Sequence, residues 1–491
     1  MCGICGYYGK KSDARKLPLS GILHRGPDGT GERAGKNFIF GHTRLAIIDV
    51  DKGSQPMCNE DDSICITFNG EIYNYKTLRD KLKRCHIFKT DCDTEVILHL
   101  YEEEGPAGLK KLDGMFALAI AAPDSFVLAR DPVGIKPLYT VEDRDGVHFA
   151  SEIKVFVKKR EKIREFPPGH ISAAGEKSLG YYSLPLSYQA NMSWNECLPE
   201  LRKRLQKSVE KRLMSDVPLG SFLSGGLDSS LISALIREQR EELHTFSVAV
   251  GNSADRRYAL MAAEHLGTIH HEYVLSPEEI WSAVPEVIYY LESYDQSLVR
   301  SAVANYFLAK MAAREVKVVL TGEGADELFA GYAYLDSFTD WNELHEELRC
   351  ITGRLHNTNL QRVDRMTMAH GLEARVPFLD KGMIEWALAI PPWYKRSETG
   401  IRKWCLREAY RDWGFLPEEI IFREKEKFAE GSGVAPVLSA MASEKAPEKD
   451  YRRELAAGAA LKSREEYYYY KVFCDYFGRD IALSLVGHSR S

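Results

Sequence analysis

The chain has 491 residues, of which 44% are hydrophobic and 28% are charged. This composition excludes a largely disordered, collagen-like or low-complexity protein, and the length predicts several domains rather than one small binding module. The formal net charge of −6 provides no overall basic field for nonspecific nucleic-acid binding, so we expect no nucleic-acid partner. Ten scattered cysteines, and the lack of any uncharged apolar run of about 18 residues, predict a cytosolic (cytoplasmic) protein with no membrane partner.

Residues 1–185 are predicted to form a β-rich layered domain. Short apolar runs broken by Gly, Pro, Asn and Asp are typical of strands, and they recur at 38–50, 64–73, 116–131 and 147–152. The segment 93–105 places apolar side chains at positions 96, 97, 100 and 101, which is the spacing of one helix face. This helix is expected to pack on a sheet.

A second domain is predicted over residues 195–491. The stretch 167–195 is dense in Pro, Gly, Ser and Asn and lacks periodicity, so the connection between the domains is placed there. A helix is expected over 198–213, and the segment 217–239 reads as buried strand, glycine turn and helix. Further apolar runs alternate with helical segments such as 258–266 and 301–314. This alternation favours a parallel sheet wound with helices.

Cys2 is a candidate nucleophile. If Met1 is removed, Cys2 becomes the first residue, and its free α-amino group could act as a base beside its own thiol. Two other interpretations are a small buried residue and, with Cys5, half of a C-x-x-C metal pair. A zinc site needs a second close pair, and the remaining N-terminal cysteines, at 58, 65, 85 and 92, are too widely spaced.

A second group of residues fits an amino-acid substrate. Arg44 could hold an α-carboxylate through two parallel hydrogen bonds, and Glu71 and Asp93 could hold an α-ammonium group. Asn69 and the N–H of Gly70 could stabilise the oxyanion that forms when a thiolate attacks an amide. Each residue alone also has a structural interpretation: a hairpin turn at Asn69-Gly70, a helix cap at Asp93, and a surface ion pair at Arg44.

The N-terminal motifs together resemble the class II (N-terminal nucleophile) glutamine amidotransferase domain. In order they are CGICG, HRGPDG, RLAIID, FNGEIYN, DGMFALAI, ARDPVGIKPLY and FASEIK. The resemblance implies an αββα sandwich with Cys2 as the nucleophile, which releases ammonia from glutamine. It also implies a glutamine-binding set of Arg44, Asn69, Gly70, Glu71, Asp93 and backbone near Ile47.

The motif SGGLDSS at 224–230 predicts a phosphate cradle, because it places backbone N–H groups and hydroxyls at a helix N-terminus. It is not a Walker A loop, since the lysine of that motif is missing. The motif resembles the PP-loop of ATP pyrophosphatases. That resemblance implies that pyrophosphate is held, with Asp228 near Mg²⁺, by Ser224, Gly225, Gly226, Asp228, Ser229 and Ser230.

A third motif, VVLTGEGADELFAGY at 318–332, places acidic side chains at the expected carboxyl end of a parallel strand, where ligands bind in open α/β sheets. Asp326 could bind Mg²⁺ through oxygen, and Glu323 could take a proton from attacking ammonia. The alternative is an acidic helix N-terminus, which the helix dipole favours by itself.

The C-terminal motifs, taken in order, are similar to the synthetase domain of glutamine-hydrolysing asparagine synthetase. They are SGGLDSS, FSVAV, YDQSLVRSA, TGEGADELFAGY, QRVDRMTMAHGLEARVPFLD and REKEKFAEGSG. The resemblance implies that Leu223 and Val248 contact adenine or ribose, Thr321 and Gly322 contact the nucleotide, and Lys425 faces the phosphates. Arg300 is a further candidate for that charge, with a surface salt bridge as the alternative. The segment 361–380 is expected to shape the acceptor pocket or to pack as a helix.

The resemblance implies an α/β protein of two domains, an αββα sandwich and a doubly wound parallel-sheet PP-loop domain. Its cofactors would be ATP and Mg²⁺, its substrates glutamine, aspartate and ATP, and its assembly a homodimer. A sheltered passage for ammonia, lined by apolar and small side chains, would join the two sites. The chain departs from the family pattern at Thr321, which keeps the usual hydroxyl, and at Glu430, which replaces an aspartate. The second departure leaves a different carboxylate acceptor as the rival function; an idle glutamine or nucleotide sensor and a tRNA-modifying enzyme are weaker alternatives.

Overall fold

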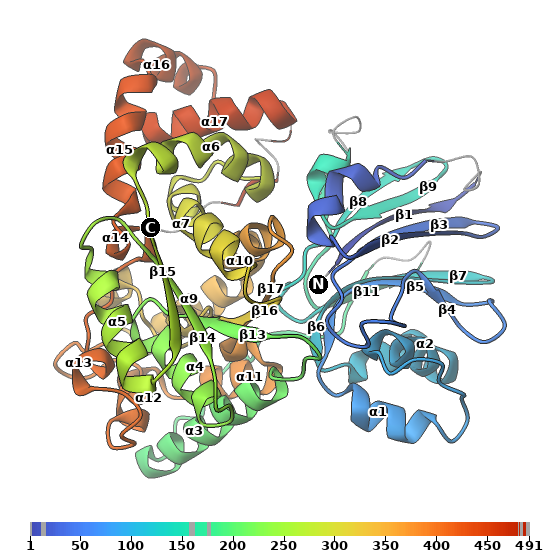
Figure 1. Cartoon of the computed structure of the whole chain (residues 1–491), viewed down its shortest axis with the longest axis horizontal. Coiled ribbons are helices and arrows are strands. Elements are labelled where there is room, and N and C mark those ends of the chain that lie inside the picture. Colours follow the sequence, from blue (N-terminus) through green and yellow to red (C-terminus); the bar gives the residue numbers. More distant parts are fainter. Residues whose placement is uncertain are drawn as a thin grey trace.

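The computed structural model describes residues 2–10, 16–156, 163–173, 178–479, 481 and 485–487. Two stacked antiparallel sheets form the N-terminal half, and a parallel sheet with surrounding helices forms the C-terminal half, which lies beside it (Figure 1). The predicted fold class is confirmed: an αββα-type layered domain is joined to a doubly wound α/β domain.

Each N-terminal sheet has six antiparallel strands. The first has the order β10-β8-β9-β1-β3-β2, with bounds Ile163–Glu165, Tyr139–Asp143, Gly146–Ala150, Gly3–Gly9, Phe38–Arg44 and Gly29–Ala34. The second has the order β12-β11-β7-β6-β5-β4, with bounds Leu179–Gly180, His170–Ala173, Ser125–Arg130, Gly114–Ala122, Cys65–Ile72 and Met57–Cys58. The expected apolar runs therefore all contain strands.

Apolar side chains on facing strands hold the two sheets together. Phe40 and Phe149 of the first sheet cluster with Phe126 and Leu128 of the second. Helices α1 (Tyr75–Leu82) and α2 (Asp93–Glu104) cover the outer face of the second sheet through a separate apolar cluster (Figure 1). The helix expected over 93–105 is thus confirmed, and its apolar face packs as the spacing predicts.

The C-terminal sheet has the order β15-β14-β13-β16-β17, and all its strands are parallel. The strands span Ile269–Val274, His244–Ala249, Leu219–Phe222, Val318–Leu320 and Glu373–Arg375. Helices that follow the central strands pack against them: α4 (Leu227–Arg237), α5 (Ala254–Leu266) and α7 (Gln296–Ala312). This arrangement places the carboxyl ends of β13, β14 and β16 at one edge of the sheet.

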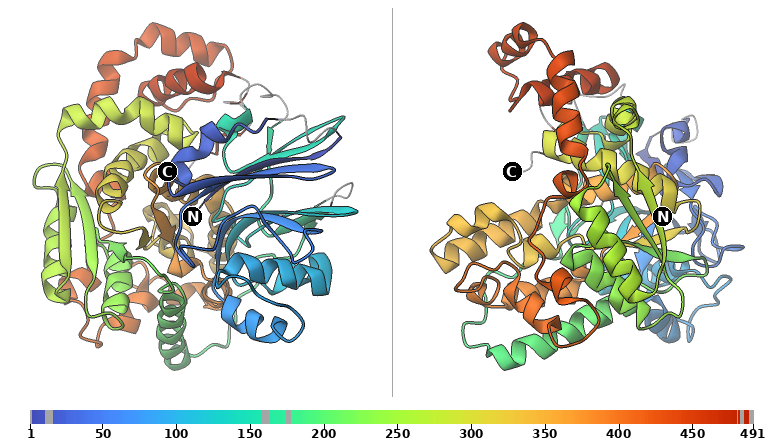
Figure 2. Two further views of the ribbon diagram at one scale, coloured as in Figure 1. Left: turned by 45° about the vertical axis from the view of Figure 1, so that its right-hand side comes forward. Right: turned by 60° about the vertical axis from the view of Figure 1, so that its left-hand side comes forward.

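The remaining helices complete the C-terminal half. Helices α3 (Trp194–Lys211) and α6 (Pro277–Leu291) each begin with a capping box, formed by Ser193 with Glu196 and by Ser276 with Glu279. Of the last large helices, α15 (Val434–Lys445) and α17 (Arg464–Phe477) pack beside α6, and α16 (Glu448–Ala456) packs against α17 (Figure 2). The others are α8 (Ala325–Leu328), α9 (Trp341–Gly353), α10 (Asn359–Met368), α11 (Lys381–Ala389), α12 (Trp404–Tyr410), α13 (Glu418–Ile421) and α14 (Phe428–Gly431).

Buried charges join the two halves. The Arg25 guanidinium is fully buried and bonds Glu152 of its own half at 2.7 Å and Asp364 of α10 at 2.9 Å. Arg365 of α10 pairs with Glu292 at 2.9 Å, and Glu292 accepts the Ile153 backbone N–H at 3.0 Å. Apolar residues from both halves share one core cluster around these pairs. The interface is therefore partly apolar and partly ionic.

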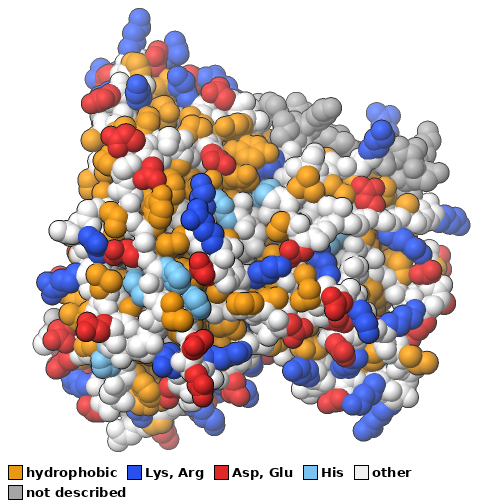
Figure 3. Space-filling view, viewed as in Figure 1, with side chains coloured by type: hydrophobic (Ala, Val, Ile, Leu, Met, Phe, Trp, Pro, Cys, Tyr) orange, Lys and Arg blue, Asp and Glu red, His pale blue; other side chains and the backbone are white. Residues whose placement is uncertain are grey.

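One disulfide joins Cys58 and Cys65, which lie opposite each other in the pairing of β4 with β5. The scattered cysteines, which predicted a cytosolic protein, gave no sign of this pairing, because the six residues between Cys58 and Cys65 carry no hairpin signal. In the described part of the chain, no helix has the length and apolarity needed to cross a membrane. On the face shown in Figure 3, basic and acidic side chains are interspersed.

Candidate functional sites

Cys2 lies immediately before β1 and is almost completely buried. Its backbone N–H donates to Asn69 Oδ1 at 3.0 Å, and its carbonyl oxygen accepts from Arg25 Nε at 3.1 Å. Burial raises the pKa of the Cys2 thiol, and the nearby Glu373 and Glu71 carboxylates raise it further. The thiol therefore needs a base to become a nucleophile. Met1, whose removal would supply that base, lies outside the described residues.

Asn69 and Gly70 lie inside β5, so the alternative of a hairpin turn is wrong. Phe116, which is opposite Gly70, uses its backbone N–H and carbonyl for Asp131 on the other side of β6. Gly70 therefore forms a non-hydrogen-bonded pair and points its N–H away from β6. The buried Asn69 Nδ2 has no hydrogen-bond partner among the described residues. Two N–H donors are thus available beside Cys2 for an oxyanion.

Glu71 and Asp93 lie near the end of β5 and bring buried carboxylates close to Cys2. Asp93 Oδ2 accepts the Ile72 backbone N–H at 2.8 Å, and burial raises the pKa of Asp93 to about 6. Glu71 is 3.7 Å from Arg375 Nη2, and burial, with Glu373, raises its pKa well above the ordinary value. Asp93 lies in the first turn of α2 with Cys92 as the N-cap, so it does not cap this helix.

Arg44 and Ile47 follow β3 toward the same end of the first sheet. The Arg44 guanidinium donates to the backbone carbonyls of Val50 and Asp49, each at 2.7 Å, so the alternative of a surface ion pair is wrong. The Ile47 carbonyl accepts the Asp216 N–H at 3.1 Å and keeps a second lone pair. Gly3 pairs with Thr43, which places Cys2 and Arg44 next to each other at the end of this register.

The SGGLDSS loop connects β13 to α4, as a phosphate-binding loop requires. Gly225 has φ +69°, and an added Cβ would lie 2.2 Å from the Tyr258 carbonyl carbon, so only glycine fits. The hydroxyls of Ser224 and Ser229 are 3.0 Å apart at the start of α4. The Ser230 hydroxyl is buried without a hydrogen-bond partner among the described side chains.

Two lysines and two aspartates meet at the carboxyl edge of the sheet. Lys403 Nζ is 2.6 Å from both Asp228 Oδ2 and Asp326 Oδ1, and Lys425 Nζ is 2.8 Å from Asp326 Oδ2. Burial acts to raise the pKa of Asp326, but the two ammonium groups hold it well below its usual range. Asp326 is therefore a carboxylate at neutral pH.

Glu323 and Glu327, which are four residues apart, have different partners. Glu323 forms an ion pair with Arg362 of α10. Burial and the adjacent Asp326 raise the pKa of Glu327 to about 7, while Tyr332 donates to Glu327 Oε1. The alternative of a simple acidic helix N-terminus does not account for these specific partners. Glu323 therefore lines the cavity with its carboxylate beside the Arg362 guanidinium.

A cavity of about 580 Å³ lies over the loops that follow β13, β14 and β16. Its lining includes most of the residues expected there: Leu223, Ser224, Gly226, Asp228, Ser229, Val248, Thr321, Gly322, Glu323, Asp326 and Lys425. Arg300 also lines it, but its guanidinium pairs with Glu465 at 2.7 Å, which favours the salt-bridge interpretation. Glu430 is at the rim, 3.6 Å from Arg300. The volume is sufficient for a nucleotide together with a small acceptor.

Sequence reasoning missed several side chains of both sites. Lys403 precedes α12 at a non-glycine position with φ +57°, and no sequence signal marked it. The segment 361–380 was expected to shape the acceptor pocket, and Arg362 does line that cavity. Glu373 and Arg375 of the same segment instead form β17 and face the Cys2 side. Strand β17 consists only of the three residues Glu373–Arg375, which are too few to show strand periodicity in the sequence.

Comparisons with known proteins match both halves of the chain. A family model described as "Glutamine amidotransferase domain" matches residues 1–178, and one described as "Asparagine synthase" matches residues 200–344 and 336–482. An Arabidopsis thaliana protein named "Asparagine synthetase [glutamine-hydrolyzing] 2" is 38% identical over 99% of this chain and 89% of its own length. "Asparagine synthetase B [glutamine-hydrolyzing]" of Escherichia coli K12 is 40% identical over 88% of this chain and 83% of its own length.

Proposed function

Because the chain belongs to the family of glutamine-hydrolysing asparagine synthetases, we propose that it makes asparagine from aspartate, with ammonia taken from glutamine and with ATP as the activating substrate. The products are asparagine, glutamate, AMP and pyrophosphate. One observation supports the assignment best. A single chain holds a buried cysteine beside two available N–H donors and, separately, a 580 Å³ cavity at a PP-loop.

At the first site, Arg44 binds the α-carboxylate of glutamine, and Glu71 and Asp93 bind its ammonium group. The Cys2 thiolate attacks the side-chain amide carbon, while Asn69 Nδ2 and the Gly70 N–H stabilise the oxyanion. The α-amino group exposed by removal of Met1 takes the thiol proton and returns a proton to the leaving ammonia. Water then releases glutamate from the thioester.

At the second site, the PP-loop holds the β- and γ-phosphates of ATP while an aspartate β-carboxylate oxygen attacks the α-phosphorus. Pyrophosphate leaves and β-aspartyl-AMP forms. Lys425 neutralises charge on the phosphates. Ammonia then attacks the activated carbonyl carbon and Glu323 accepts the excess proton, so that AMP leaves as asparagine forms. Leu223 and Val248 contact the adenosine, while Thr321 and Gly322 lie beside the phosphates.

The carboxylates of the second site fit a magnesium ion. Asp228 and Asp326 converge on Lys403, and Asp228 Oδ1 is buried without a hydrogen-bond partner in the part of the chain that the structure describes. Oxygen donors of this kind are the ligands that Mg²⁺ prefers. When bound, the ion would neutralise charge on the pyrophosphate leaving group. Both residues are proposed as its ligands.

We place the domains at residues 1–185 and 195–491, and we propose a cytoplasmic enzyme that forms a homodimer. The sheltered ammonia passage also stays a proposal: the interface has the apolar residues it requires, together with the buried ion pairs around Arg25. The rival function is amidation of another carboxylate. Glu430 at the cavity rim favours testing it, because its side chain is one methylene longer than the aspartate of the family pattern.

The test measures AMP, pyrophosphate and asparagine in a mixture of enzyme, Mg-ATP and glutamine, with and without aspartate. Aspartate-dependent release in equal amounts supports the proposal. Cys2→Ala is expected to abolish glutamine hydrolysis but to keep synthesis from added ammonia. Asp228→Ala should abolish pyrophosphate release and keep some glutaminase activity. Absence of aspartate-dependent release from an enzyme that hydrolyses glutamine would contradict the acceptor and move the search to other carboxylates.

A further inference from the structure

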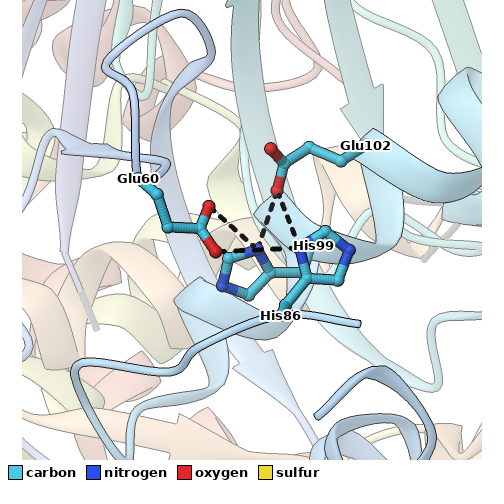
Figure 4. A group of neighbouring side chains, drawn as sticks. All are labelled: Glu60, His86, His99 and Glu102. Atoms are coloured by element: carbon cyan, nitrogen blue, oxygen red, sulfur yellow. Dashed lines mark hydrogen bonds and ion pairs between the residues drawn. The ribbon is translucent and has the colours of Figure 1, made fainter. Parts of the chain in front are cut away.

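Two histidines and two glutamates converge on the outer side of the glutaminase half, away from both sites described above (Figure 4). Glu60 lies in the loop after β4, and His86 lies in the loop after α1. His99 and Glu102 are one turn apart on α2. One possible ligand atom from each residue lies within 4.8 Å of all the others. We call these four residues the His–Glu cluster.

The geometry of the His–Glu cluster approaches that of a tetrahedral metal site. His86 Nδ1 is 3.8 Å from Glu60 Oε1 and 3.6 Å from Glu102 Oε2. His99 Nδ1 is 3.8 Å from Glu60 Oε2 and 2.7 Å from Glu102 Oε2. Ligands about 2.0–2.1 Å from zinc in a tetrahedron are about 3.3 Å apart. The shortest contact has to open, and the 3.8 Å contacts have to close, each by roughly half an ångström, to admit an ion.

Each of three cluster residues also has an outer partner on the side away from the centre. His86 Nε2 is 3.0 Å from Glu103, and His99 Nε2 is 3.8 Å from Glu95. The second oxygen of Glu102 accepts from the Asn59 amide at 2.7 Å. A metal-binding histidine typically donates its other ring N–H to a carboxylate, which fixes the tautomer and directs the free lone pair at the ion. His86 has such a carboxylate at hydrogen-bond distance, whereas Glu95 lies near His99 Nε2 without bonding it.

The arrangement of the two rings favours a shared cation over two separate ion pairs. The His86 and His99 rings stack with centroids 4.4 Å apart and planes at 25°, and both Nδ1 atoms face the same Glu102 oxygen. Each ring thus directs one nitrogen at the same point, as two imidazoles that share one ion must. Glu60 is the most exposed of the four, so an ion can enter from its side.

We propose that the His–Glu cluster is a four-ligand structural site for a divalent transition metal, zinc. Two imidazole nitrogens and two carboxylate oxygens are donors that zinc accepts, and a set closed by four protein ligands leaves no position for catalysis. The ion would clamp the loops carrying Glu60 and His86 to α2. Helix α2 begins with Asp93, so the clamp would stabilise the element that carries this glutamine-binding candidate.

The test uses the full-length enzyme without a polyhistidine tag, stripped with a chelator, loaded with zinc chloride and desalted. Metal content is measured by mass spectrometry, and the melting temperature is recorded with and without zinc. The variants are His86→Asn and Glu103→Gln, with Glu104→Gln as the matched control, because Glu104 lies on the same helix but pairs outward with Lys111 at 2.5 Å. His271→Asn monitors the second histidine group, where His244 and His271 already hydrogen-bond each other at 2.9 Å.

We expect wild type and the Glu104 and His271 variants to retain one zinc ion per chain and to melt at a higher temperature with zinc. His86→Asn should lose both effects, and Glu103→Gln should weaken zinc affinity about 10- to 100-fold, the usual cost of losing an outer partner. The proposal is overturned if wild type retains no more zinc than His86→Asn, or if His271→Asn rather than His86→Asn removes the ion. His86→Asn and Glu103→Gln change residues that are not buried, so a folding defect does not obscure the result.

Discussion

Replacement of Asn69 by alanine is expected to remove glutamine hydrolysis while leaving ammonia-dependent synthesis intact. Asn69 is fully buried in β5, its Oδ1 accepts the Cys2 N–H at 3.0 Å, and its Nδ2 has no hydrogen-bond partner among the described residues. An unpaired buried donor is costly unless a ligand completes it. The oxyanion of the tetrahedral intermediate is the group that would do so.

The expected loss of glutaminase kcat follows from the number of oxyanion donors that remain. The Gly70 N–H points away from β6 and stays available in the Asn69→Ala variant, so one of two donors is lost. Removing one such donor costs about 10²–10³ in kcat, or about 2.7–4 kcal/mol of transition-state stabilisation. The Cys2 N–H also loses its buried acceptor, which lowers folding stability by about 1–3 kcal/mol.

The assay compares glutaminase kcat with the rate of asparagine formation from ammonium chloride in the same preparation. Asn74→Ala is the matched control, because its amide donates to the Lys111 carbonyl at 2.9 Å at the protein surface. The control should keep both activities. Glutaminase activity within about threefold of wild type in Asn69→Ala would refute the reasoning, because one lost oxyanion donor must cost more than that. Loss of both activities would instead indicate a folding defect.

Three further results are expected. Gly225→Ala should abolish pyrophosphate release but keep glutaminase activity, because the added Cβ would overlap Tyr258. Gly226→Ala should have a milder effect, since its Cβ meets only a serine hydroxyl at 3.4 Å. Equal losses of pyrophosphate release in the two variants would contradict this reasoning. Glutaminase kcat/KM should fall as pH drops below about 6, where Asp93 becomes protonated. Asp93→Asn should lower kcat/KM and remove this acidic limb of the pH profile. A variant with the pH profile of wild type would exclude Asp93 as the titrating group. Burial disfavours ionised Glu165, yet its ion pairs hold its pKa at about 2 against 4.5, so its stabilisation is complete above pH 4.5 and is lost as pH falls toward 2. Glu165→Gln should therefore lower the free energy of unfolding at pH 7 by at most about 3 kcal/mol, measured by urea denaturation, and a variant as stable as wild type would contradict the ion pairs.

The sequence predicted the features whose signals are local. The strand, glycine turn and helix around SGGLDSS are consecutive, so the PP-loop could be recognised without knowledge of the sheet. Residues 93–105 show one apolar face and do form α2. At Asn69-Gly70 the local signal was ambiguous, because the same dipeptide favours hairpin turns. Here glycine is required by the Met115 carbonyl oxygen of β6, which would lie 2.1 Å from an added Cβ.

The features that could not be predicted depend on long-range topology. Strand β17 has three residues, too few for a periodic pattern, and it reaches the Cys2 side only because it is the edge strand next to β16. Lys403 meets Asp228 and Asp326 across more than seventy residues of sequence. His86 and His99 meet only when the loop after α1 folds back along α2. None of these contacts has a sequence spacing that points to it.

The burial of Arg25 between the two halves limits how far they can be treated as interchangeable modules. Its guanidinium is shared between Glu152 of one half and Asp364 of the other, and its Nε holds the carbonyl of Cys2. A fragment cut in the connecting segment would leave Asp364 without its closest cation and Arg25 without one of its two anions. A graft of this glutaminase half onto another synthetase would therefore have to include the facing turn of α10 as well. The unit that evolves together is the pair of contacting surfaces, one from each half, rather than either half alone.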